Sequence, residues 1–322
     1  MAKLIKVKEL NDKFKKIVDD IINLQSKDEI KTWFHEFAMS MSFMKSYSFR
    51  NLLLIHSQKS NAIFTNGFVS WKKLGRYPKK GTGIYIYKPI FKKVDNIESD
   101  KSESDDDNEP KKVLIGFSPI CVFDYQDTKG KPIDIYEKIL SERNKIKIQC
   151  YGTHGDVSIL VNLSKKFDQY INQHGFKYEI TDTGDAAGFA IHSYEYNKKS
   201  GTVVKNEFAI DDNFNIKKGQ EFGTKLHEFY HVKYHKLRSD KQRCELEAEM
   251  YSALVLGAFN LNIDKCAAYL YNWTQKLQYE KKKEIFLDVF DNVYKEAHDT
   301  ISFIRDEEEK PYQNDEKINI PF

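Results

Sequence analysis

The first part of the chain repeats apolar side chains at the spacing of amphipathic helices. Residues 7–24 place their apolar positions on one stripe, at the i, i+3, i+4 spacing of a helix. Ser26 followed by Glu29 forms a capping box, which predicts that a second helix begins there and runs through Ala38. Residues 47–55 end in an apolar run that predicts a short buried helix. Three helices are therefore expected before the first strands.

Farther along, the apolar positions change to the alternation that is typical of strands. Residues 84–91 and 113–124 predict two strands that pair as a small antiparallel sheet. The residues between them, 95–110, have almost no apolar content. Because such a segment cannot bury enough surface to offset the entropy lost on ordering, we expect a disordered loop at the tip of this hairpin.

The second half of the chain combines a hairpin with helices. Residues 188–196 and 202–210 alternate on either side of a polar turn, which predicts a β-hairpin with a strand that could pair with an extended peptide. A helix is expected after Ser164, and two more between residues 264 and 305. Together these elements predict an α+β fold.

Composition sets the class of protein. At 322 residues, the chain is long enough for two domains, which we place at residues 1–145 and 146–322. The four cysteines show no close pairing, as is typical of reduced thiols in a cytosol. The first residues lack the apolar core of a signal peptide, and no run of about 20 apolar residues could span a membrane. We therefore expect a cytoplasmic protein without membrane spans.

The net charge of +3 hides an asymmetry along the chain. Residues 1–93 carry 19 Lys and Arg against 7 Asp and Glu, whereas residues 94–109 carry 8 acids against one Lys. A basic first third suggests a module that binds a polyanion, joined to a second part with another task.

A basic segment with aromatic residues points to nucleic acid as that polyanion. Residues 68–81 mix five cations with Trp71 and Tyr77. Cations neutralise phosphates, and aromatic faces stack on exposed bases, which suits single-stranded DNA. The alternative is that Trp71 and Tyr77 are core residues beside a solvated basic turn. The candidate nucleic-acid contacts are Tyr47, Phe49, Arg50, Trp71, Lys72, Lys73, Arg76, Lys79 and Lys80.

Residues 226–232 contain the motif His-Glu-x-x-His. Positions i and i+4 lie on one helix face, so His227 and His231 can both direct a ring nitrogen at one metal ion. Glu228 would then contact a water on that ion and act as its base. A solvated helix with these residues by chance is the alternative, but the apolar residues around the motif favour a buried helix. The expected cofactor is Zn²⁺, which His, His and Glu ligands favour.

Two residues compete for the place of third ligand. His235 continues the row, but a straight helix separates it from His227 by about 12 Å along the axis, so we expect it in the outer shell. Glu245 opens a second helix and shares a face with Glu249. We assign Glu245 as the ligand and Glu249 as the carboxylate that orients a ligand histidine. An ordinary acidic helix start is the alternative.

Several motifs match a known family. Residues 47–55, 71–81 and 116–130 resemble the N-terminal domain of ArdC-like antirestriction proteins, which binds single-stranded DNA. The motif HExxHxxxH from His227 and the motif ExxAE from Glu245 resemble the metallopeptidase domain of those proteins and of the ImmA/IrrE group. The resemblance implies that the second half is a zincin-like domain with a β-hairpin before the HExxH helix. It also implies Glu245 as the third ligand, and a role in protecting incoming DNA of a mobile element or phage from restriction.

Three functions are therefore considered. The first is a zinc-dependent peptidase tethered to single-stranded DNA, with an unknown protein or peptide substrate. It would need a donor that faces the zinc, for which Tyr194, His192, Tyr234 and His235 are the candidates. The second is a DNA-binding protein with a structural, non-proteolytic metal site. The third is an ImmA-like protease that cleaves a repressor.

Overall fold

The computed structural model describes ten stretches of the 322-residue chain. These are residues 5–44, 47–93, 112–141, 157–182, 184, 188–197, 201–211, 218–235, 240–276 and 278–305. The predicted disordered loop at 95–110 lies outside these residues. Among them, no helix combines the length and the hydrophobicity needed to cross a bilayer.

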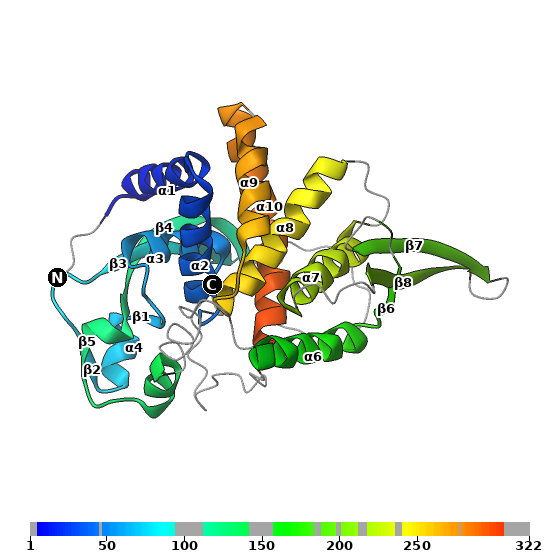
Figure 1. Ribbon diagram of the computed structural model, residues 1–322. Helices are drawn as coiled ribbons and strands as arrows, with labels where there is room; N and C mark the ends of the chain where they lie inside the picture. The colour runs from blue at the N-terminus through cyan, green and yellow to red at the C-terminus, as the bar shows by residue number, and fades with distance from the viewer. Residues whose placement is uncertain are drawn as a thin grey trace, which may run out of the picture.

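Three helices begin the chain, as predicted: α1 (Val7–Ile22), α2 (Lys27–Met41) and α3 (Phe49–Gln58) (Figure 1). The Ser26 side chain accepts a hydrogen bond from the Glu29 backbone N–H at 3.1 Å, which caps α2. The Glu29 carboxylate accepts from the backbone N–H of Gln25 rather than from that of Ser26. The cap therefore satisfies free backbone donors at the point where the sequence predicted a helix start.

Two small sheets follow in the N-terminal half. The longer pair is the antiparallel hairpin of β3 (Ile84–Lys93) and β4 (Lys112–Asp124), which confirms the predicted sheet. The short strand β1 (Thr65–Gly67) adds to the other side of β4, so that the order is β1-β4-β3. The second sheet is a ribbon of β2 (Arg76–Pro78) and β5 (Thr128–Gly130) that lies beside the short helix α4 (Phe68–Lys73).

The C-terminal half places a three-stranded sheet beside helices. Its elements are α6 (Val157–Gln173), β6 (Lys177–Thr181), β7 (Gly188–Asn197), β8 (Gly201–Asp211), α7 (Lys218–Tyr234), α8 (Lys241–Ala258), α9 (Asp264–Lys276) and α10 (Tyr279–Ile304). The strand order is β6-β8-β7, with the predicted hairpin of β7 and β8 antiparallel and β6 parallel to β8. The helix expected after Ser164 begins earlier, at Val157, because apolar helical positions continue back to that residue.

The fold class is α+β, as predicted, and one apolar core joins its two halves. Trp33 and Phe37 of α2 stack with ring centroids 5.0 Å apart, and Phe49 of α3 stacks on Phe290 of α10 at 4.6 Å. The Tyr294 hydroxyl of α10 also donates to the backbone carbonyl of Tyr47 at 2.9 Å. The boundary proposed between residues 145 and 146 falls outside the described residues, so the domain division stays a prediction.

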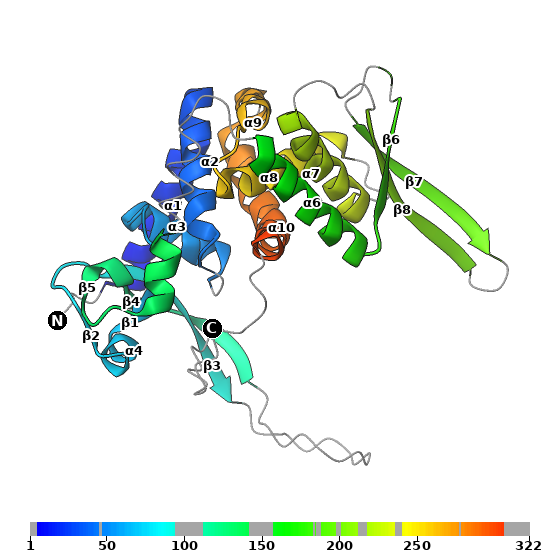
Figure 2. The ribbon, with the colours of Figure 1, turned by 60° about the horizontal axis from the view of Figure 1, so that its bottom comes forward.

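Helix α8 is the central element of this core. It lies between α2 and α7 in both views (Figures 1 and 2), and α2, α7, α9 and α10 all pack on it. Gly257 makes the contact with α2 possible. A Cβ at this position would lie 3.1 Å from the Ala38 Cβ and 3.3 Å from the Phe34 carbonyl oxygen.

This contact generates a stability prediction for two helical glycines. A Cβ at Gly223 would lie 3.6 Å from Leu256, which is ordinary van der Waals contact. The change Gly223→Ala is therefore expected to stabilise the protein by about 1 kcal/mol, because alanine has the higher helix propensity. The same change at Gly257 is not expected to raise the free energy of unfolding, because the backbone of α2 has to move to admit the methyl group. Chemical denaturation measures both free energies of unfolding. Equal gains for Gly223→Ala and Gly257→Ala would contradict the close packing of α2 on α8.

Candidate metal centre

Helix α7 presents the three residues of the His-Glu-x-x-His motif. Its apolar side buries Phe222, Leu226 and Phe229 completely, which fixes the rotation of the helix about its axis. The opposite side then carries His227 and His231 toward α8, with 18% and 12% of their side chains exposed. The buried stripe on α7 therefore decides where the motif points.

Glu245 of α8 completes a group of three that could hold a metal ion. One ligand atom from each of His227, His231 and Glu245 lies within 4.8 Å of the others. The two Nε2 atoms are 3.0 Å apart, and each lies 3.3 Å from an oxygen of Glu245. Ligand atoms at 2.0–2.1 Å from a tetrahedral zinc ion would be roughly 3.3–3.4 Å apart. The separations therefore fit a small tetrahedral cation.

The partners of the other ring nitrogens assign the tautomers. The His227 Nδ1 lies 3.5 Å from a carboxylate oxygen of Glu249, and His231 Nδ1 lies 2.7 Å from His235 Nδ1. A carboxylate only accepts, so a proton on His227 Nδ1 faces Glu249, while Nε2 faces Glu245 and the metal position. Glu249 thus lies beside the ring nitrogen of His227 that faces away from Glu245, and its role in orienting the histidine stays a prediction.

His231 is oriented by a longer chain of contacts. His235 Nε2 donates to the Glu247 carboxylate at 3.0 Å, which leaves its Nδ1 to accept from His231. The other oxygen of Glu247 accepts from Arg243 Nε at 2.9 Å, and Arg243 also bonds Asp288. His235 therefore lies behind His231 and not at the metal position, as the helix geometry predicted.

Glu247 is the residue that sequence reasoning missed. On α8 it lies off the face that Glu245 and Glu249 share. Its side chain is nevertheless fully buried against His235 and Arg243. A buried carboxylate needs charged or hydrogen-bonding partners, so Arg243, four residues earlier on the same helix, was the available signal.

Glu228 occupies a tight position between α7 and the start of β7. A Cβ on Gly188 would lie only 3.0 Å from Glu228 Cγ and 2.8 Å from the Ala209 carbonyl oxygen. Glycine at 188 therefore lets the edge strand β7 approach the glutamate. The side chain of Glu228 is 8% exposed.

The charges in the site shift its pKa values in opposite directions. Hydrogen bonds from His227 and His231 hold the pKa of Glu245 well below its ordinary value. Burial raises the pKa of Glu228, and the opposing charges of the two histidines do not cancel that effect. The two carboxylates therefore differ: Glu245 stays charged, as a metal ligand does, whereas the raised pKa of Glu228 favours its acceptance of a proton.

The structure describes the side chains of two of the four residues considered as hydrogen-bond donors to the reacting oxygen. The Tyr234 hydroxyl donates to Glu296 at 2.5 Å, so it is engaged away from the site, and His235 is engaged with Glu247. The side chains of Tyr194 and His192 lie outside the described residues. Tyr269 of α9 was not anticipated: burial, together with the charges of Glu245 and Glu249, raises its pKa to about 12.

Four of the expected nucleic-acid contacts have structural roles instead. Trp71 is fully buried and donates from its ring N–H to the Phe123 carbonyl at 2.8 Å. Phe49 and Arg76 are 2% and 6% exposed. The Tyr47 hydroxyl donates to the Thr65 carbonyl at 3.0 Å. None of these side chains offers an open face to a base or phosphate, because each fills the space between neighbouring elements.

The remaining five candidates are at the surface. Arg50 lies over the Phe14 ring, 5.6 Å from its centroid, and is otherwise exposed. The four lysines around α4 and β2 are exposed as well: Lys72, Lys73, Lys79 and Lys80. Their contact with phosphates stays a prediction.

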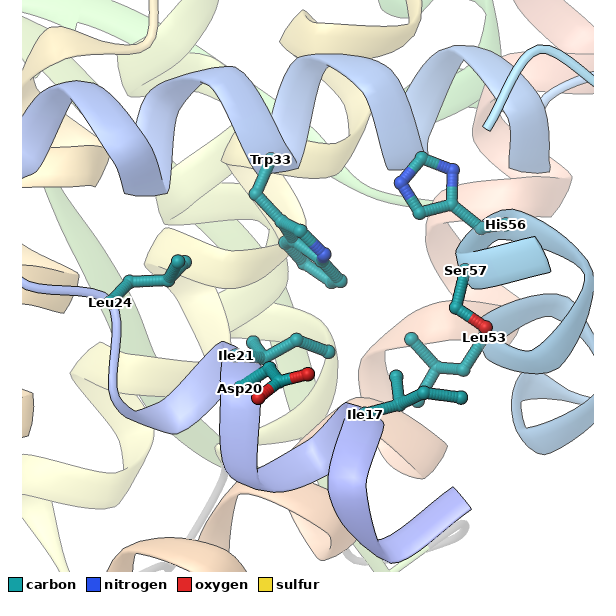
Figure 3. Close-up of a pocket in the computed structure, with 8 residues that line it drawn as sticks. All are labelled: Ile17, Asp20, Ile21, Leu24, Trp33, Leu53, His56 and Ser57. Atoms are coloured by element: carbon teal, nitrogen blue, oxygen red, sulfur yellow. The ribbon is translucent and has the colours of Figure 1, made fainter. Parts of the chain in front are cut away.

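A separate pocket lies between α1, α2 and α3 (Figure 3). Trp33, Ile21 and Leu53 turn apolar surface toward it, with Ser57 at its edge. None of the residues of the metal group lines it. Its polar members are Asp20, His56 and Ser57, and the rest of the lining is apolar. Because the pocket contains none of the residues that converge around the metal position, the metal centre is the candidate functional site.

Comparison with known proteins agrees with this architecture. Residues 11–122 match the family described as the N-terminal domain of anti-restriction factor ArdC. The metal-free crystal structure of the antirestriction protein ArdC from plasmid R388 is similar, with a TM-score of 0.50, 18% identity, and coverage of 91% of this chain and 98% of that one. The Mn(II)-bound structure of that protein has a TM-score of 0.46 and 18% identity over 91% of this chain and 96% of that one. No curated protein matches the sequence.

Replacing His235 is expected to weaken metal binding although it is not a ligand. Phenylalanine keeps the ring but removes the acceptor for His231 Nδ1, so the ligand loses its orientation and affinity falls about 10- to 100-fold. Chelator competition with purified protein measures the change. The control is His174→Phe, since His174 contacts the backbone carbonyl and the ring of Tyr170 and is not among the residues of the metal group. Equal affinity in both variants would contradict the proposed chain of contacts.

Metal affinity is also expected to fall in mild acid. Burial lowers the pKa of His227, but the hydrogen bond with Glu245 and the charges of Glu249 and Glu228 outweigh burial and raise it above 6.5. This proton has to leave before the metal binds, so affinity should drop by about tenfold per pH unit below that raised pKa. Chelator competition at a series of pH values measures this pH dependence. A metal affinity that is constant between about pH 7.5 and 6 would contradict the prediction.

Proposed function

We propose, from the family match of residues 11–122 and the geometry of the site, that this chain is an ArdC-like antirestriction protein. In this proposal the N-terminal half binds single-stranded DNA, and the C-terminal half is a zinc-dependent peptidase. It would protect incoming DNA of a mobile element or phage. The observation that carries the enzymatic part is the convergence of His227, His231 and Glu245 beside Glu228.

Different residues of the site would bind the metal, accept the proton and bind the peptide. His227, His231 and Glu245 would hold Zn²⁺, which supplies a water of lowered pKa and polarises a carbonyl when it is bound. Glu228 takes the proton of the attacking water, because its raised pKa brings it toward the working pH. The strand β7, which reaches Glu228 at Gly188, is an edge of its sheet among the described strands, and an extended peptide would pair with that edge.

Exposure of the metal group favours catalysis over a structural role. A structural zinc site is closed by four protein ligands, whereas a catalytic site keeps one position open. Among the described residues, the group has three ligands, and the Glu245 side chain is 44% exposed. A non-proteolytic metal site is therefore the second candidate, and cleavage of a repressor by the same peptidase is the third.

The change Glu228→Gln separates these functions. It spares all three ligands and nearly preserves shape, but removes the base, so hydrolysis of the protein substrate should fall by about 100-fold or more. Protection is measured as the ratio of DNA transfer into restricting and non-restricting hosts, and metal content is measured by elemental analysis. We expect protection to be lost while metal content stays the same.

The control is Glu179→Gln, an exposed glutamate of β6. It should leave protection unchanged. If Glu228→Gln protects DNA as well as the unchanged protein does, with metal and DNA binding intact, the peptidase proposal fails and the structural metal site is favoured.

A further inference from the structure

The ribbon of β2 and β5 separates its side chains into an inner and an outer face. Tyr77 pairs with Lys129 across the two strands, and the neighbouring pairs are Arg76 with Gly130 and Pro78 with Thr128. Arg76 and Thr128 are buried at 6% and 5% exposure, whereas Tyr77 is 53% exposed. Since side chains alternate along a strand and cross-strand partners share a face, Tyr77 and Lys129 lie together on the outer face.

The inner face holds the ribbon firmly. Arg76 Nε donates to the Thr128 hydroxyl at 2.7 Å, and its guanidinium lies over the Tyr125 ring, 4.0 Å from the centroid. Gly130 permits close contact of the strands, because a Cβ there would lie 2.5 Å from the Gly75 carbonyl oxygen. Arg76, expected from the sequence to bind DNA, thus supports the surface that presents Tyr77.

The outer face is surrounded by positive charge. Lys79 follows Tyr77 by two positions, and its ammonium donates to the Gln126 carbonyl at 3.1 Å, on the outside of the ribbon. The exposed cations on α4, on the ribbon and just beyond each are Lys72, Lys73, Lys79, Lys80, Lys129 and Lys131. Of the nearby acids, Asp127 is paired with Lys59 at 2.7 Å and Glu137 accepts from the Tyr125 hydroxyl at 2.6 Å, while Asp134 is exposed.

We propose that the outer face of the β2–β5 ribbon is the surface that binds single-stranded DNA. Tyr77 stacks on a base, and Lys79 and Lys129 contact the phosphates on either side of it. An exposed ring between cations suits a single strand, because an unpaired base has a free face and the backbone carries a negative charge at each nucleotide. This inference rests on the proposed DNA binding and assigns its site.

A second exposed apolar surface in the same half suits DNA less well. Phe91 and Phe117 of the β3–β4 hairpin are 45% and 50% exposed. The hairpin strands are joined in sequence by residues 94–109, which carry 8 acids and one Lys. That charge repels a polyanion, so Phe117 serves as a matched control: an aromatic residue of similar exposure in the wrong electrostatic setting.

The test compares Tyr77→Ala with Phe117→Ala in the full-length protein. Binding of a fluorescently labelled oligothymidine is followed by anisotropy at several salt concentrations. We expect Tyr77→Ala to weaken binding about fivefold or more, as loss of one stacked base does, and Phe117→Ala to change it less than about twofold. Tyr77→Phe should bind like the unchanged protein, which shows that the ring and not the fold is being tested.

A double change of Lys79 and Lys129 to Gln tests the charges. Because the protein would then neutralise two fewer phosphates, the slope of log affinity against log salt should become shallower by about 1.4. The same double change at Lys88 and Lys92 of β3 should leave the slope unaltered.

Two results would overturn the inference. If the unchanged protein binds the oligonucleotide and Tyr77→Ala binds it equally well, DNA binding stands but this surface is wrong, as it would be if the ribbon docks a protein instead. If the unchanged protein does not bind single-stranded DNA, the proposed function loses its DNA-binding part and this assignment falls with it.

Discussion

The packing of α7 against α8 is the contact on which the candidate site depends. It brings four carboxylates and three imidazoles into a largely buried space, an arrangement that would be unfavourable without matched partners. The histidines satisfy Glu245, His227 faces Glu249, and Glu247 is satisfied by Arg243 and His235. Once the Nε2 protons of His227 and His231 leave, both lone pairs face the point where the three ligand atoms converge, which is the condition for binding a metal.

Helix α8 connects that site to the rest of the molecule. One side of it carries Glu245 toward α7, and another packs on α2 of the N-terminal half at Gly257 (Figure 2). Aromatic rings of α2, α3 and α10 extend the same core across both halves. The proposed DNA-binding surface on the N-terminal half and the candidate metal centre on the C-terminal half are therefore built on one continuous apolar core.

Reasoning from the sequence succeeded where one helix or one strand pair decided the outcome. The four-residue spacing placed His227 and His231 on a single face, and about 12 Å of helix excluded His235 as a ligand. It failed where burial depended on distant segments. Trp71 and Arg76 stand in a basic, turn-rich stretch that is typical of a nucleic-acid surface, yet residues 123–131 cover both of them.

The sequence by itself determined the α+β class, the helix that carries the motif, and the helix that follows with its acids, because these depend on local periodicity and capping. Only the tertiary structure decided that Glu247 belongs to the site, that Gly188 brings β7 against Glu228, and that Tyr77 rather than Trp71 faces solvent. The physical reason is that the exposure and partners of a side chain are set by what packs over it, and here the covering residues come from other parts of the chain.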